Sequence, residues 1–110
     1  MTAATKRKGN AAERECAGLL SDLLGYNVKR RYNLGTHDDT GDLVGLPNTV
    51  IQVADWKDVL RAMREKPLDA EVQRELAGAD YAATFLRLRG GMWRVCQTPE
   101  QWTAMWRETR

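Results

Sequence analysis

The chain has 110 residues, of which 43% are hydrophobic and 29% are charged. This composition is typical of one globular domain and excludes a disordered chain, a collagen-like chain and a disulfide scaffold, and no apolar run is long enough for a membrane span. Seventeen basic and fifteen acidic residues leave a net charge of +2, so the total charge alone does not indicate a nucleic-acid-binding protein.

The N-terminal third predicts a helix followed by a strand. Residues 1–8 are basic and are expected to form a flexible tail. Residues 10–24 place apolar side chains three or four positions apart, and Gly25 follows where a helix commonly ends. Residues 26–32 alternate as in a strand, and residues 33–40 predict a loop. The predicted apolar stripe of the helix consists of Ala12, Cys16, Leu19, Leu20 and Leu23.

A short extended piece, a strand and an interrupted helix are predicted next. Residues 42–45 are short and extended, and residues 49–54 are rich in β-branched side chains. Asp55 is expected to cap the following helix. Because proline lacks a backbone donor and clashes with the preceding turn, Pro67 is expected to break this helix, which then resumes until Gly78.

The C-terminal third predicts a hairpin and a final helix. Residues 81–88 form the strongest predicted strand, and Gly90 and Gly91 are expected to turn the chain into a second strand at residues 92–97. Thr98 begins a helix-capping pattern. The final helix is expected to turn its apolar side chains toward the core: Trp102, Met105 and Trp106.

These elements predict a single α+β domain over residues 1–110, α/β/α-like, in which a mixed central sheet of about five strands is flanked by helices. Cys16 and Cys96 form no CxxC pair and are expected to be reduced core thiols. Residues 1–8 lack the apolar stretch of a secretory signal. We therefore expect a cytoplasmic protein.

The charged residues are clustered along the chain. Basic residues gather at Lys6, Arg7 and Lys8, at residues 29–31, and at Arg87, Arg89 and Arg94. Acidic residues gather at Asp38, Asp39, Asp42, Asp55 and Asp58. Such a pattern is typical of metal-dependent enzymes that act on polyanions, because cations hold phosphates while carboxylates hold the metal. The alternative is a solvated surface of mixed charge.

Three short motifs follow one another: Lys8-Gly9 with Glu13-Arg14 in the first helix, Gly41-Asp42 before a strand, and Gln52-Val53-Ala54 at the end of the next strand. Taken singly, these residues are ordinary on helix surfaces, turns and strands, but their joint order favours an active site. The order resembles that of the PD-(D/E)xK nuclease superfamily, most closely the small Holliday junction resolvases of archaea and resolvase-like proteins of phages. The resemblance covers nearly the whole chain and implies a restriction-endonuclease-like fold.

The resemblance also implies a catalytic metal site. In this family an aspartate and a second carboxylate bind Mg²⁺, the glutamate of the first helix assists, and a lysine orients the attacking water. On this chain it implies that Asp42, Gln52 and the backbone carbonyl of Val53 hold Mg²⁺, or Mn²⁺ as an alternative. Glu13 would assist directly or through water.

Two positions depart from the family pattern. Gln52 replaces the second carboxylate, and its neutral oxygen stabilises a hard cation less than a carboxylate does. Ala54 replaces the lysine, and loss of such an electrostatic partner commonly costs a factor of about 10²–10³ in rate. Lys57 is the candidate for a relocated lysine, and the alternative is a solvated helix residue. The predicted catalytic residues are therefore Glu13, Asp42, Gln52 and Lys57.

Basic side chains are expected to hold the DNA backbone by charge rather than by reading base edges: Lys6, Arg7, Lys8, Lys29, Arg30 and Arg31. Trp56, beside the strand end, is the aromatic residue expected to contact DNA. His37, with Asp38 and Asp39, is considered as a second metal site or general base, against the alternative of an ordinary loop.

The predicted function is a metal-dependent, structure-specific DNA endonuclease of the Holliday junction resolvase type. Its expected partner is branched DNA, and the near twofold symmetry of a four-way junction predicts a homodimer. If a phage encodes the chain, the expected location is the host cytoplasm, with no membrane partner. One alternative is a nuclease fold that binds branched or duplex DNA without cutting it. The other is a protein-interaction module on the same scaffold.

Overall fold

The computed structural model describes residues 3–31 and 41–109, with backbone alone for residues 3–6. Helices and strands in this part of the chain are α1 Ala3–Leu24, β1 Lys29–Arg30, β2 Leu43–Val44, β3 Thr49–Ala54, α2 Val59–Ala77, β4 Tyr81–Leu88, β5 Met92–Cys96 and α3 Pro99–Glu108. The predicted loop at residues 33–40, with His37, Asp38 and Asp39, lies outside the described residues. No helix among the described residues is both long enough and apolar enough to cross a bilayer.

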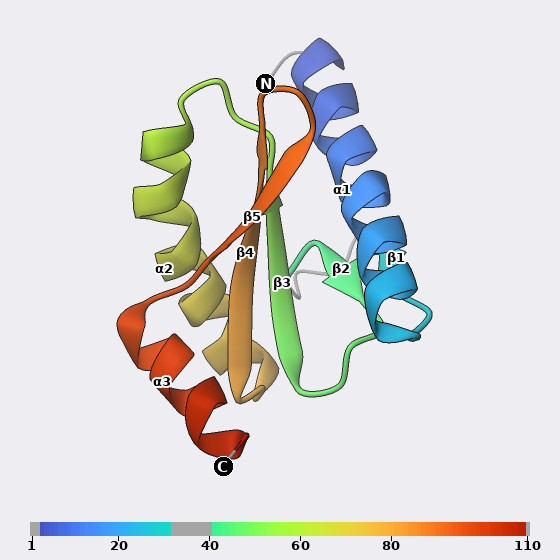
Figure 1. Cartoon of the computed structure of the whole chain (residues 1–110). Coiled ribbons are helices and arrows are strands. Elements are labelled where there is room, and N and C mark those ends of the chain that lie inside the picture. Colours follow the sequence, from blue (N-terminus) through green and yellow to red (C-terminus); the bar gives the residue numbers. More distant parts are fainter. Residues whose placement is uncertain (1–2, 32–40, 110) are drawn as a thin grey trace.

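All five strands form one mixed sheet in the order β1-β2-β3-β4-β5. Strands β3 and β4 are parallel, and the other neighbouring strands are antiparallel. Parallel strands require a crossover connection, which α2 supplies. Helices α1 and α2 cover opposite faces of the sheet (Figure 1). The predicted α+β fold, with a mixed five-stranded sheet flanked by helices, is confirmed.

Strand β3 lies at the centre of the core. On one face of the sheet, Ile51 and Val53 pack with Cys16 and Leu20 of α1. On the opposite face, α2 packs against the sheet mainly through small side chains together with Leu86: Val50, Ala54 and Ala82 of the strands, and Ala62 and Ala70 of α2. Because β3 is buried on both faces, a polar side chain within it must find partners inside the protein.

Helix α1 and strand β1 differ in length from their predictions. Helix α1 begins at Ala3, so residues 3–8 are helical rather than a flexible tail. The alanine, lysine and arginine residues of this segment have high helix propensity. Strand β1 contains only Lys29 and Arg30 of the seven residues predicted. Leu23, which was predicted in the apolar stripe of α1, is exposed. Ala17, which was not predicted there, is buried.

Helix α2 is continuous, although a break at Pro67 was expected. Ala62 and Ala70, on either side of Pro67, pack against the sheet. This packing outweighs the cost of about 3 kcal/mol for a proline inside a helix. The N-cap is Asp58, whose side chain accepts from the backbone N–H of Arg61 at 3.0 Å, so the prediction of a cap at residue 55 was wrong.

Helix α3 presents its aromatic side to solvent, which contradicts the expectation of inward side chains. Trp102, Met105 and Trp106 are 59%, 39% and 44% exposed. The residue that α3 buries is Gln101, whose side-chain amide donates to the carboxylate of Glu71 on α2. A polar contact to α2 therefore holds the helix, and its two tryptophans are largely exposed to solvent.

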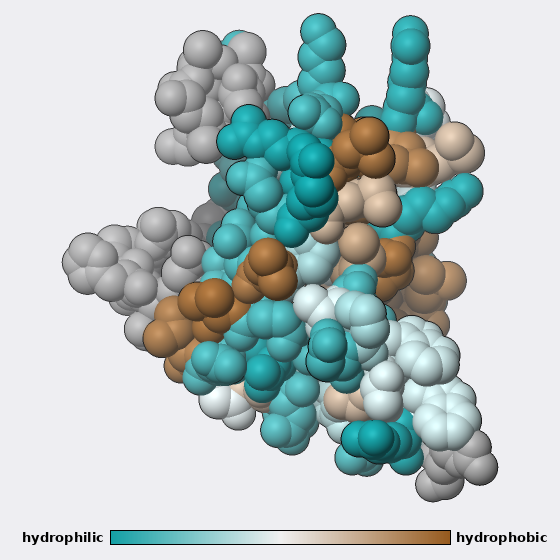
Figure 2. All heavy atoms as spheres, turned by 90° about the vertical axis from the view of Figure 1, so that its left-hand side faces the viewer, coloured by the Kyte–Doolittle hydropathy of each residue, from teal (hydrophilic) through white to brown (hydrophobic). Residues whose placement is uncertain are grey.

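Exposed apolar side chains also lie on the outer face of α2: Leu60, Met63, Leu68, Val72 and Leu76. On the side of the molecule that Figure 2 turns toward the viewer, brown apolar patches are separated by teal hydrophilic side chains. The exposed apolar residues on this side therefore form separate patches rather than one continuous surface.

The two cysteines are free thiols, Cys16 buried and Cys96 half-buried. Burial is the main cause that raises the pKa of Cys16 to about 12. The Cys16 thiol therefore stays protonated at neutral pH and contributes packing rather than reactivity.

Candidate functional site

Asp42 lies at the edge of β3, where β2 stops pairing with it. The backbone N–H of Asp42 donates to the carbonyl of Ile51 at 2.8 Å, and its carboxylate oxygen Oδ2 accepts from the N–H of Val53 at 2.8 Å. The N–H and C=O groups of one residue in a strand point to the same edge, so the carbonyl of Val53 also faces Asp42. The structure thus brings together Asp42 and Val53, which were predicted to share a site.

Glu13 of α1 approaches the same edge. Its side chain is 19% exposed, and its carboxylate accepts from Nε of Arg30 at 2.8 Å. Burial and the negative charge of Asp42 raise the pKa of Glu13, while Arg30 and then Lys66 oppose this rise. Two carboxylates that repel one another in a half-buried position are typical of a cation site.

Gln52 points to the opposite face of the sheet, toward α2. It is 2% exposed, its amide nitrogen donates to the side-chain oxygen of Gln73, and its amide oxygen accepts from Nζ of Lys66 at 3.1 Å. Gln52 is therefore held at both ends by side chains of α2. Ala54, two residues further along, contributes only a buried methyl group to the core.

Lys66 is the functional candidate that the sequence analysis missed. Its ammonium group contacts Gln52 and lies within electrostatic reach of Glu13. A signal for it is present in the sequence, because Lys66 lies four residues after Ala62 and four before Ala70, and that spacing places all three on one helix face. The break expected at Pro67 concealed this spacing.

Lys57 is placed elsewhere. It is exposed and lines a different pocket, and it makes no hydrogen bond or ion pair to the residues that the structure describes. Trp56, its neighbour, lies with its ring 5.6 Å from Nζ of Lys66 and 5.6 Å from Cζ of Arg61. The lysine that the structure brings to Gln52 and within electrostatic reach of Glu13 is therefore Lys66.

The basic residues predicted to bind DNA have different surroundings. Arg30 is turned inward to Glu13 and to Oδ1 of Asn10, each at 2.8 Å. Lys29 and Arg7 are exposed, and the backbone N–H of Arg31 donates to the carbonyl of Asp42 at 2.8 Å. Nζ of Lys8 lies 3.7 Å from the carboxylate of Asp55. The side chain of Lys6 lies outside the described part of the chain.

The donor set suits a hard cation that keeps much of its water. Among residues 7–31 and 41–109, no three His, Cys, Asp or Glu side chains are grouped as metal ligands. Asp42, Glu13 and the carbonyl of Val53 would supply one or two carboxylates and a neutral oxygen. Mg²⁺ is commonly held in this way, with several waters retained.

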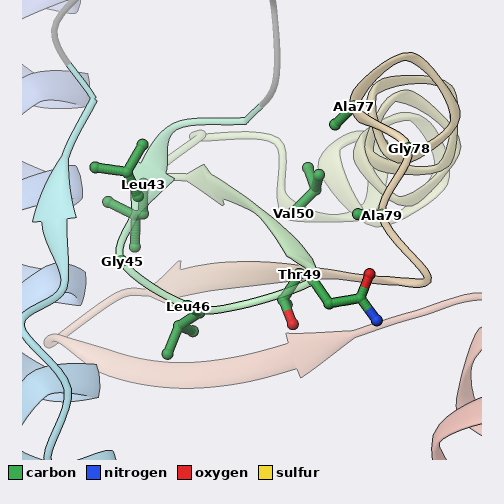
Figure 3. Close-up of a pocket in the computed structure, with 10 residues that line it drawn as sticks. Leu43, Gly45, Leu46, Thr49, Val50, Ala77, Gly78 and Ala79 are labelled. Carbon is green, nitrogen blue, oxygen red and sulfur yellow. The ribbon is translucent and has the colours of Figure 1, made fainter.

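The pocket drawn in Figure 3 offers different chemistry. It lies between the β2–β3 turn and the end of α2, and its lining includes Leu43, Val50 and Ala79 but no acidic or basic side chain. It supplies no charged side chain for proton transfer or metal binding, whereas carboxylates meet at the edge of β3, so the candidate site is that edge at Asp42.

No family model, no curated protein and no solved structure matches this chain.

Proposed function

We propose that this protein is a metal-dependent DNA endonuclease with its active site at the edge of β3. Asp42, Glu13 and the carbonyl of Val53 would hold Mg²⁺, and Lys66 would take the place of the lysine that the resemblance puts at Ala54. The observation that carries the proposal is the convergence of three charged groups from separate segments: Glu13, Asp42 and Lys66.

Each residue has a distinct role in the proposed mechanism. A bound Mg²⁺ would lower the pKa of a coordinated water and offset charge on the scissile phosphate. Asp42, anchored by the N–H of Val53, would hold the metal. Gln52 is a positioning residue, because its amide oxygen holds the ammonium group of Lys66 near the strand end. Lys66 would stabilise the negative charge that develops on the phosphate.

The test is cleavage of labelled four-way, flap and linear DNA with Mg²⁺ or Mn²⁺. Asp42→Asn keeps an acceptor for the Val53 N–H but removes the charge, so cleavage should fall by about 10²–10³. Lys66→Ala should lower the rate about 10²–10³-fold at saturating DNA. Arg64→Ala, which removes an exposed cation from the same helix, is the matched control and should retain full activity.

Three outcomes decide the proposal. Cleavage that survives Asp42→Asn would show that the assignment of the site is wrong. Loss of turnover in Lys57→Ala but not in Lys66→Ala would return the lysine role to Lys57. If the wild-type protein cleaves none of the three DNA shapes with either metal, the proposal of nuclease activity is wrong.

One observation favours a second candidate, a nuclease fold that binds DNA without cutting it. Both ends of the Gln52 amide are occupied by α2, and Ala54 is a buried methyl group. The site then offers only two carboxylates, fewer than the family pattern supplies. This candidate predicts salt-sensitive binding of branched or duplex DNA with no cleavage, whichever metal is added.

A further inference from the structure

A basic pocket lies where the parallel strands β3 and β4 end, at the top of Figure 1. Its volume is about 600 Å³. Residues from three separate parts of the chain line it: the beginning of α1, the connection from β3 to α2, and the β4–β5 hairpin. The carboxyl ends of parallel strands are a common place for ligands in α/β sheets, because the connecting segments diverge there.

The charged lining is four cations and one carboxylate: Lys8, Lys57, Arg87, Arg89 and Asp55. Two of the cations have acidic partners. Lys8 lies 3.7 Å from Asp55, and Nε of Arg87 donates to Glu15 at 2.9 Å. Lys57 and Arg89 pair with no acid in the described ranges 7–31 and 41–109. The pocket therefore carries an excess of positive charge, which favours an anionic ligand.

Trp56 joins this pocket to the candidate active site. It lines the pocket, and its ring lies 5.6 Å from Nζ of Lys66, which in turn contacts Gln52. A nucleic-acid strand bound at Asp42 would thus find further cations along the same end of the sheet. Lysine and arginine contacts to successive phosphates are what orient a protein on a nucleic-acid backbone.

We propose that this pocket is a second phosphate-binding site, occupied by a backbone phosphate of the DNA whose scissile bond lies at Asp42. This inference rests on the proposed nuclease function for the source of the phosphate. A DNA backbone and a free di- or triphosphate both carry the phosphate group that would bind here. The experiment therefore separates these two ligands. Lys57 and Arg89 are the residues expected to contact the phosphate, whereas the cation proposed for the chemical step is Lys66.

The test compares two double variants that lose the same charge. Lys57→Ala with Arg89→Ala removes the two unpaired cations of the pocket. Arg64→Ala with Arg107→Ala removes two exposed cations outside the pocket lining. The affinity for a duplex and for a four-way junction is measured with Ca²⁺ over a range of salt concentrations. Binding of inorganic pyrophosphate is measured by calorimetry on the same proteins.

The pocket variant should bind DNA about tenfold more weakly, and the slope of log affinity against log salt should fall by about two. The cleavage rate of Arg89→Ala alone at saturating DNA should remain that of the wild type. The matched control should keep both the affinity and the slope. If the pocket variant and the control are indistinguishable, the inference is wrong, while the proposed function is unaffected.

The pyrophosphate arm separates failure of the inference from failure of the function. Wild-type protein that binds neither DNA nor pyrophosphate overturns both. Pyrophosphate binding that is lost in the pocket variant, in a protein that binds no DNA, would reject the DNA backbone as the ligand and assign the pocket to a soluble phosphate compound.

Discussion

Gly41 fixes the position of the Asp42 carboxylate. Its φ angle is +100°, and a Cβ atom built on it would lie 2.9 Å from the backbone oxygen of Ile51. Only glycine adopts this conformation without strain and allows the two backbones to approach so closely. The glycine of the Gly-Asp motif is therefore explained by backbone geometry, whatever the role of the aspartate.

Gly41→Ala should lower the free energy of unfolding by about 1–3 kcal/mol, because the new methyl group is forced against β3 in an unfavourable backbone conformation. Gly18→Ala is the matched control, since nothing lies within 4 Å of a Cβ atom at that helical position. It should instead stabilise the protein by about 0.5–1 kcal/mol. Denaturant unfolding of both variants measures the two effects, and equal shifts would contradict the argument.

Glu13 predicts a pH dependence of stability in metal-free buffer. Burial and the charge of Asp42 raise its pKa above the ordinary value of 4.5. Protonated Glu13 is thus favoured in the folded state. Its stabilising contribution is complete below that ordinary pKa and is lost as the pH rises through the raised, folded-state pKa.

Glu13→Gln does not suffer this loss. The difference in stability, the free energy of unfolding of Glu13→Gln minus that of the wild type, should therefore be larger at about pH 7 than at about pH 4. Denaturant unfolding at the two pH values in EDTA gives the comparison, with the exposed Glu75→Gln as control. A difference that is independent of pH would show that the ionisation of Glu13 is not coupled to folding.

Whole elements were predicted best where burial on both faces leaves little choice. The strands at residues 49–54 and 81–88 were predicted to the residue, and the helix ends at Gly25 and Gly78 are confirmed, since their positive φ angles suit glycine. The break predicted at Pro67 was wrong. Helix propensity is a local property, whereas the packing of α2 against the sheet depends on residues distant in the sequence. That error concealed Lys66, and no nearby motif marks a lysine on a crossover helix.

For helix α3 the periodicity was predicted correctly, but its apolar stripe was predicted to face the core rather than solvent. Its aromatic stripe predicted an inward face, but the side chain that α3 buries is Gln101, which donates to the carboxylate of Glu71 on α2. Periodicity identifies a stripe, whereas the partner of that stripe depends on neighbours distant in the sequence.

Gln101→Ala should therefore destabilise the protein more than Trp102→Ala does. Removing the buried amide leaves the Glu71 carboxylate without that donor, at a cost of about 1–3 kcal/mol. Trp102 is 59% exposed, so its replacement should cost less than about 1 kcal/mol. Thermal unfolding of the two variants checks the order. The reverse order would mean that α3 is held by its aromatic side.

At the scale of the whole molecule, the exposed aromatic side of α3 is the expected contact of a homodimer. Trp102 and Trp106 are stacked, with ring centroids 6.3 Å apart. Both rings are more than two-fifths exposed. Tryptophan is enriched at the centres of protein interfaces, where its large surface is buried on association. A twofold dimer would present two active sites to a junction of the same symmetry.

Sedimentation velocity over a range of protein concentrations tests the dimer. The wild-type chain should shift from monomer to dimer as concentration rises, and the double variant Trp102→Gln with Trp106→Gln should remain monomeric while staying folded. Leu60→Gln with Leu76→Gln on the outer face of α2 is the control for general surface polarity. If the wild-type chain is monomeric at every concentration, the prediction of a dimer is wrong.

The bond from the Val53 N–H to Asp42 also has a consequence for solubility. Beyond β2, this carboxylate occupies a backbone donor of β3 that no strand pairs in the described part of the chain. Open donors at a rim are templates on which strands of other molecules add, and a charged side chain placed there discourages such growth. The same aspartate would then both bind a metal and disfavour self-association through added β-strands.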